Sequence, residues 1–181
     1  MGSAVDEVGA NERESRLRPV PEAVARLVGV VGPRRTAAYP VDRSAIGYFR
    51  EFCEYADPRS DPARTGPIEA PASFVLTAIR SPSWAADGGH RRHQFVTVSL
   101  PLGTTKLVNL GVAHAFIRRL REGERVSFAN TIVDVVPKAN RLGPGFLVVE
   151  RIDVYGGADD LVARSTTTNF AYGWPGDEES R

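Results

Sequence analysis

The residues best suited to binding phosphate or moving protons form one basic run, His90-Arg91-Arg92-His93. Arginine and protonated histidine donate hydrogen bonds to phosphate oxygens and to the carboxylates of an acidic protein. The two histidines have no further ligand at a suitable spacing, so we expect no metal site. The run follows two glycines and also fits an exposed loop with no ligand. We therefore keep His90, Arg91 and Arg92 as candidate ligand-binding residues, with a solvated loop as the alternative.

Three other reactive side chains have simple structural explanations. Cys53 is the only cysteine and has no histidine nearby in the sequence, so we expect a small buried residue on a helix rather than a nucleophile. Ser73 opens an apolar segment, where it can cap a helix or lie beside free N–H groups that receive a ligand oxygen. His114 lies in a run typical of a strand, and we expect it to be packed or hydrogen-bonded there.

The composition is that of a globular protein with one domain. The chain has 181 residues, of which 42% are hydrophobic, and its 23 basic and 22 acidic residues nearly cancel. This balance favours neither nucleic acid nor a membrane surface as a partner. There is neither a long apolar run nor an apolar leader, so we expect a cytoplasmic protein. We expect a polar tail at 1–18, one domain at 19–172 and a second tail at 173–181.

The elements that must position these residues begin with helices. Pro21 and the apolar spacing of PEAVARLVGVVG predict a first helix. A second is predicted in RSAIGYFREFCEYA, with Asp42 or Ser44 as its cap and one apolar face formed by Ile46, Phe49, Phe52, Cys53 and Ala56. The prolines of ADPRSDP end this helix. The segment APASFVLTAIR is apolar and fits either a buried helix or a strand.

The second half of the chain has the pattern of strands. Five runs are rich in Val, Ile, Thr and Phe and are separated by turn-forming residues: QFVTVSLPL, LVNLGVAHAFI, ERVSFANTIVDVV, GFLVVERIDVYG and LVARSTTTNFAYG. Helices followed by consecutive strands predict an α+β domain with an antiparallel sheet.

The order of these elements resembles the MaoC-like dehydratase family, over about residues 20–172. The resemblance is carried by VGPRRTAAYPVDRSAIGYFREFCEYA, PIEAPASF, FIRRLREGERVSFANTIVDV and GFLVVERIDVYGGADDLVARSTTT. It implies a hot-dog fold, in which an antiparallel sheet wraps around a central helix. It also implies acyl thioester substrates, carried on coenzyme A or acyl carrier protein, and no cofactor. Members usually assemble as dimers or as two fused halves, so the resemblance implies a homodimer or a heterodimer with another hot-dog chain. Such pairing would also cover an exposed sheet edge.

The family's catalytic motif is not intact in this chain. Active members take an aspartate and a histidine from a motif of the type Asp-x-Asn-Pro-x-His, just after the first long helix. If Pro62 matches the motif proline, Asp61 replaces the asparagine, Arg59 the aspartate and Arg64 the histidine. If Asp57 matches the aspartate instead, no histidine follows at the right spacing.

Several interpretations of this degenerate motif remain open. The first is a dehydratase or hydratase of 3-hydroxyacyl or enoyl thioesters, with Asp57 and Asp61 as candidate acid–base residues and Arg64, Ser73 and the basic run as candidate substrate contacts. The second is a non-catalytic partner of another hot-dog chain, and the third is an acyl-thioesterase. Both aspartates also fit a purely structural role at a helix end and in a turn.

Overall fold

The fold is built on one five-stranded antiparallel sheet. We describe residues 17–80 and 94–175 of a computed structural model. In chain order, the first part of the chain contains α2 (Glu22–Ala25), the short strand β1 (Arg35–Thr36), α3 (Arg43–Phe52), η1 (Pro58–Ser60), η2 (Ala72–Phe74), α4 (Val75–Ala78) and η3 (Thr97–Ser99). Four long strands follow: β2 (Lys106–Phe116), β3 (Ser127–Asn140), β4 (Gly143–Tyr155) and β5 (Leu161–Tyr172). The η elements are short 3-10 helices.

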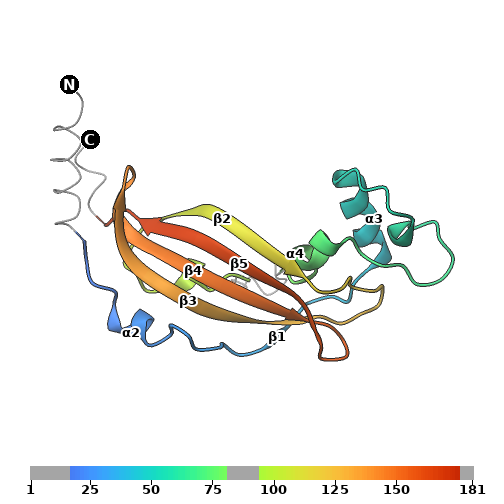
Figure 1. Ribbon diagram of the computed structural model, residues 1–181, viewed down its shortest axis with the longest axis horizontal. Coiled ribbons are helices and arrows are strands. Elements are labelled where there is room, and N and C mark those ends of the chain that lie inside the picture. The colour runs from blue at the N-terminus through green and yellow to red at the C-terminus, as the bar shows by residue number, and fades with distance from the viewer. Residues whose placement is uncertain (1–16, 81–93, 176–181) are drawn as a thin grey trace, which may run out of the picture.

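The long strands are four of the five that the sequence predicts. The strand order is β1-β3-β4-β5-β2, and every pairing is antiparallel. Bulges between Ile132 and Asp134 and between Asn109 and Gly111 interrupt the register, and such bulges add bend and twist to a sheet. Figure 1 shows the resulting long, curved sheet. The predicted α+β class with an antiparallel sheet is confirmed.

The fifth predicted strand, residues 94–102, is not a strand. It carries η3 and lies against the sheet instead of pairing within it. Its apolar side chains pack on the sheet without strand pairing. Leu102 is buried in a cluster with Phe146 and Trp174, and Val96 and Leu100 pack against that cluster. The place of the fifth strand is taken by the two-residue β1 from the N-terminal half.

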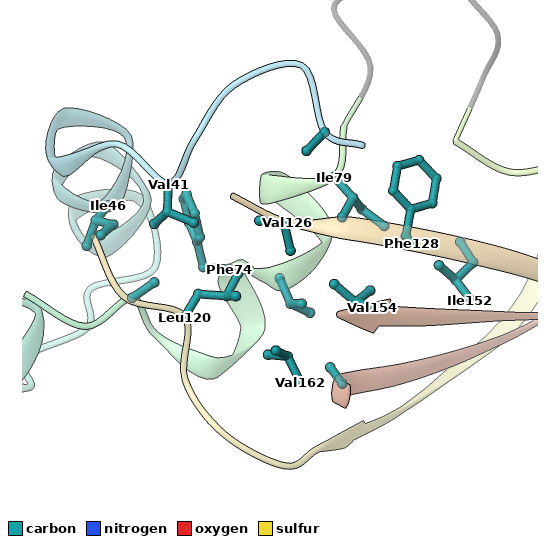
Figure 2. Packing of buried hydrophobic residues seen from close by; sticks show 14 of the residues in the cluster. Val41, Ile46, Phe74, Ile79, Leu120, Val126, Phe128, Ile152, Val154 and Val162 are labelled. Atoms are coloured by element: carbon teal, nitrogen blue, oxygen red, sulfur yellow. The ribbon is translucent and has the colours of Figure 1, made fainter. Parts of the chain in front are cut away.

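The apolar segment that begins at Pro71 forms a short helix against one end of the sheet (Figure 1). Pro71 is the N-cap of η2, which continues into α4. Phe74, Val75 and Ile79 are buried together with sheet residues that include Phe128 and Ile152. Figure 2 shows this cluster between the helix and the strand ends. The helical alternative for this segment is the one the protein adopts.

Helix α3 begins where the sequence predicts, but its apolar face is only partly covered. The Asp42 side chain accepts hydrogen bonds from the Ser44 and Ala45 N–H groups, as expected for an N-cap. Ile46 is buried, whereas Phe52 is 89% exposed and Cys53 is exposed. The prediction of a buried Cys53 is therefore wrong. Only the first turns of α3 reach the core, which helical spacing alone does not reveal.

The N-terminal segment protects one edge of the sheet. The predicted first helix is confined to the four residues of α2. Beyond it the chain runs along β3 (Figure 1), where Gly29 N–H donates to Ile132 O at 2.8 Å and Gly32 N–H to Asn130 O at 2.7 Å. From Ser127 to Ile132 the edge beside β3 is thus covered by the chain itself. At the C-terminal end, Trp174 packs on Phe146 with 5.7 Å between ring centroids.

Candidate functional site

The segment after α3, where the resemblance places the catalytic motif, is organised around Asp57. Its carboxylate accepts from the Arg59 N–H at 2.9 Å and caps η1. The same carboxylate forms ion pairs with the Arg59 and Arg119 guanidinium groups, both at 2.8 Å. Arg119 also donates to the Tyr55 hydroxyl at 2.8 Å. The Asp57 side chain is 15% exposed, so a half-closed cluster forms around it.

These contacts decide what Asp57 can do chemically. The side-chain and backbone hydrogen bonds from Arg59, assisted by Arg119, hold the pKa of Asp57 far below its usual range. A carboxylate with such a low pKa is a weak base and releases its proton too readily to serve as an acid near neutral pH. The geometry therefore favours a structural role for the Asp57 carboxylate over the acid–base role that the resemblance implies.

The two other candidates in this segment lie nearer the surface. The Asp61 carboxylate pairs with Arg50 at 3.2 Å and accepts from the Ala63 N–H at 3.0 Å. The Arg64 side chain is exposed, and its carbonyl accepts from Arg43 at 2.8 Å. A surface cavity of about 250 Å³ lies between α3 and this segment, lined by Gly47, Arg50, Glu51, Glu54, Tyr55, Ala56 and Pro62. Through Arg50 it adjoins Asp61, whereas Arg64 does not line it.

The remaining candidate contacts are not brought together by the described structure. Ser73 is exposed within η2, and the N-cap position belongs to Pro71, so Ser73 does not cap this helix. His90, Arg91 and Arg92 lie outside the described residues. The structure thus leaves their predicted role as a prediction.

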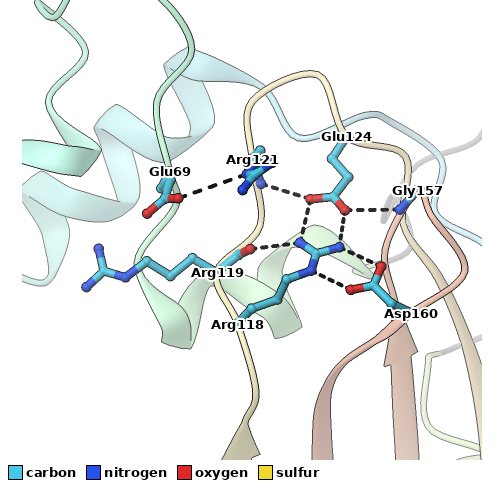
Figure 3. Close-up of polar contacts among 7 residues, drawn as sticks. All are labelled: Glu69, Arg118, Arg119, Arg121, Glu124, Gly157 and Asp160. Atoms are coloured by element: carbon cyan, nitrogen blue, oxygen red, sulfur yellow. Dashed lines mark hydrogen bonds and ion pairs between the residues drawn. The ribbon is translucent and has the colours of Figure 1, made fainter.

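A second charged cluster joins two turns next to this segment (Figure 3). The Arg118 guanidinium lies between two carboxylates: it donates to Glu124 at 2.6 Å and to Asp160 at 2.5 Å. The Gly157 N–H also donates to Glu124 at 3.0 Å. Hydrogen bonds to Asp160 and Glu124 raise the pKa of Arg118 above its ordinary value. All acceptors in this cluster are occupied, so we interpret it as a brace for the two turns.

A third polar cluster lies on the inner face of the sheet, around the fully buried Glu150. One carboxylate oxygen accepts from the Val96 N–H at 2.7 Å and from Asn130 at 2.5 Å. The other accepts from the Thr97 N–H at 3.0 Å and from the Thr97 hydroxyl at 2.6 Å. The three bonds from Val96 and Thr97 hold the segment around η3 against the sheet, and the bond from Asn130 joins β3 to β4.

Neither Arg119 nor Glu150 is among the residues predicted from the sequence. A signal for Glu150 was present, because strand alternation in GFLVVERIDVYG points it to the same face as Val148 and Ile152, both fully buried. A lone carboxylate at an inward position needs several donors. Arg119 gave no such signal, because its partners Tyr55 and Asp57 are remote in sequence.

The edge of the sheet formed by β2 remains open in the described chain. β2 pairs with β5 on one side and has no strand on its other side among the described residues. Its exposed apolar side chains include Leu107, Leu110, Val112 and Phe116, between 42% and 53% exposed. The His114 ring is exposed and stacks on Phe116 with 5.6 Å between centroids. An open edge with apolar side chains is typical of a strand that pairs with another chain.

The described residues contain neither a metal-binding cluster nor a membrane-spanning helix. No group of three or more His, Cys, Asp or Glu side chains is placed to hold a metal ion. None of the described helices has the length and apolar character needed to cross a bilayer.

Comparison with known proteins identifies the family. A family model described as "FAS1-like, dehydratase domain region" matches residues 26–165. No curated protein matches the sequence significantly.

Three solved structures share the fold. A chain of the ChsH1-ChsH2 complex from Mycobacterium tuberculosis is 23% identical, with a TM-score of 0.69 over 86% of this chain and 97% of that one. The C-terminally truncated HadBC (3R-hydroxyacyl-ACP dehydratase) complex from Mycobacterium tuberculosis gives 17% identity and a TM-score of 0.55 over 80% and 97%. A MaoC-like dehydratase from Rhodospirillum rubrum is 19% identical, with a TM-score of 0.51 over 81% of this chain and 94% of that one.

The family match covers most of the chain, and the solved structures share its sheet. The chain therefore belongs to the FAS1-like dehydratase domain region family and has the hot-dog fold of the MaoC-like dehydratases.

Proposed function

We propose that this chain is a subunit of a dehydratase or enoyl hydratase that acts on 3-hydroxyacyl or enoyl thioesters of coenzyme A or a carrier protein. In this proposal a second hot-dog chain supplies the acid–base groups. The observation that carries the proposal is the state of Asp57. In the segment where the family has its dyad, the half-buried carboxylate is bound by two arginines.

Elimination of water beside a thioester needs a base near C2, a proton donor near the leaving hydroxyl and donors for the thioester oxygen. The ion-paired Asp57 is a poor base, and Asp61 is paired with Arg50. The described residues place no histidine near either aspartate. A partner that carries an intact dyad would supply both missing groups.

A cavity beside β2 supports an acyl group as the ligand. It has a volume of about 230 Å³ and is lined by Thr97, Val98, Leu100, Leu102, Thr104, Thr105, Lys106, Leu107 and Ala171. Its lining is mixed: the leucines, Val98 and Ala171 form an apolar part suited to a hydrocarbon chain, and the threonines and Lys106 form a polar part of at least equal extent. It lies at the open edge of the sheet, so a ligand held there would also meet a chain that pairs with β2.

The open β2 edge is the proposed surface for the partner. From Ser127 to Ile132 the β3 edge is covered by the N-terminal segment, whereas β2 has no strand on its outer side among the described residues and exposes apolar side chains. Two of the solved structures that resemble this chain are complexes, as their names state. Pairing of β2 with a strand of a second hot-dog chain would continue the sheet.

The test is hydration of crotonyl-CoA by the purified full chain, alone and then mixed with candidate hot-dog chains that have an intact dyad. We expect no turnover alone and turnover with the correct partner. Asp57→Ala and Asp61→Ala should leave the catalytic step of the mixture unchanged. Turnover by the chain alone that disappears in either variant would contradict the partner assignment.

The same assay separates the alternatives of the fold. Release of free coenzyme A without hydration would identify an acyl-thioesterase instead. If no partner restores turnover but the chain still binds thioesters, a binding role without catalysis would be the better description.

A further inference from the structure

The middle of the inner sheet face carries a band of polar residues between two apolar clusters. His114 of β2 lies opposite Ser165 of β5, and Thr167 lies opposite Glu150 of β4. One apolar cluster, with Phe74 and Ile152, packs at one side of this band, and the other, with Phe146 and Trp174, packs at the opposite side. The band crosses from a buried carboxylate to the open edge of the sheet.

Two hydroxyl groups of this band have no hydrogen-bond partner in the described protein. Ser165 is 2% exposed and Thr167 is 3% exposed, and neither hydroxyl oxygen reaches a donor or acceptor. Glu150 cannot serve Thr167, because four donors already occupy its two oxygens. An unpaired buried hydroxyl costs about 1–3 kcal/mol, and native proteins seldom keep two side by side without a use.

The edge strand offers the route to these hydroxyls. His114 and Val112 lie opposite Ser165 and Thr167 in the register, and both are exposed. Directly opposed side chains on one face lie about 5 Å apart at Cβ, so these two residues are the neighbours of the hydroxyls on the side of the open edge. The exposed neighbours Leu107 and Phe116 make the surrounding surface apolar.

From this arrangement we infer that Ser165, Thr167 and His114 form a subsite for one uncharged oxygen, a ketone or hydroxyl, on an otherwise apolar acyl group. The hydroxyls donate to the ligand oxygen, and the imidazole closes over it from the edge. An anionic group is disfavoured because Thr167 lies opposite the fully buried Glu150 carboxylate, which would repel it. The inference deepens the proposed function and rests on it only for the acyl nature of the ligand.

The probe is 2-octanone, which has one ketone on an apolar chain and neither a thioester nor coenzyme A. The full chain has three histidines, so the His114 imidazole C–H signal can be followed by NMR and assigned with His114→Gln. We expect a saturable shift of this signal. Thr167→Val should weaken binding about tenfold, the equivalent of about 1.4 kcal/mol. Ser165→Ala gives a second, independent variant.

Thr166→Val is the matched control, because Thr166 lies on the opposite face of the same strand, opposite Arg151. It should bind 2-octanone as the native chain does. Absence of a saturable shift, or equal affinity in Thr167→Val and the native chain, would overturn the subsite and leave a buried water as the partner of the hydroxyls. Binding of 2-octanone without binding of any acyl-CoA would instead overturn the proposed function alone.

Discussion

Asp57 shows how neighbours rather than residue type decide what a carboxylate does. As an isolated residue after a long helix it is a reasonable acid–base candidate. In the folded chain, Arg59 and Arg119 bind it from two sides. Arg119 comes from the turn between β2 and β3, so only the fold brings it to Asp57. The cluster therefore joins the α3 end of the molecule to the sheet.

The first prediction concerns Asp57→Asn. Asparagine can still cap η1 through the Arg59 N–H, but both arginines lose their ionic partner. Because the pKa of Asp57 is lowered in the folded chain, its contribution to stability is present above the ordinary range of aspartate, about pH 4, and is lost as the pH falls further. We expect a lower melting temperature at pH 7 and a weaker dependence of stability on pH below about 4. Equal melting temperatures at pH 7 would contradict this role.

Glu150 is the residue whose replacement should affect the inner face most. In Glu150→Gln one of the two oxygens becomes an amide N–H₂, which faces two donors instead of accepting from them. Loss of these bonds should cost about 2–4 kcal/mol in the free energy of unfolding. Chemical denaturation measures this, and hydrogen exchange at the Val96 and Thr97 amides should rise. Ser99→Ala is the control. It removes a hydroxyl of the same short helix, and this hydroxyl donates to Val96 O, so the free energy of unfolding should change little.

Among the elements, the strands were the most predictable and the segments between them the least. Alternation and turn residues predict β2 to β5 because the alternation of apolar and polar residues lies within each strand's own sequence. Residues 94–102 have a similar composition but are fixed by Glu150, a contact that local pattern does not contain. The candidate site was harder still, because the partners of Asp57 come from separate parts of the chain.

The turns joined by Arg118 provide a prediction at the scale of elements. A Cβ added at Gly156 would collide with the Arg118 guanidinium and the Glu124 carboxylate. Gly156→Ala should therefore displace Arg118 and cost about 1–3 kcal/mol in the free energy of unfolding. Gly157→Ala is the matched control, because the nearest atom to its Cβ would be Glu124 Cγ at an ordinary 3.5 Å. Equal stability of the two variants would show that the brace is not important.

At the scale of the whole molecule, the two edges of the sheet differ in how far the chain covers them. Within the described residues, the N-terminal segment lies along the β3 edge from Ser127 to Ile132, whereas the β2 edge has no neighbouring strand and exposes apolar side chains. An exposed apolar edge promotes aggregation unless another chain covers it. The asymmetry is physical support for pairing through β2, with the cavity and the polar band placed beside the resulting junction.

Leu110→Lys tests this asymmetry directly. Leu110 is 53% exposed on β2, so lysine is accommodated in the single chain, but a partner strand would have to bury its charge next to an apolar surface. We expect the association measured by light scattering, with itself or with a partner chain, to weaken at least tenfold, equivalent to about 1.4 kcal/mol. Val136→Lys on β3, where the valine is 42% exposed, introduces the same charge away from the open edge and should leave association unchanged. If both variants associate like the native chain, β2 is not the pairing edge, and the partner must bind another face of the sheet.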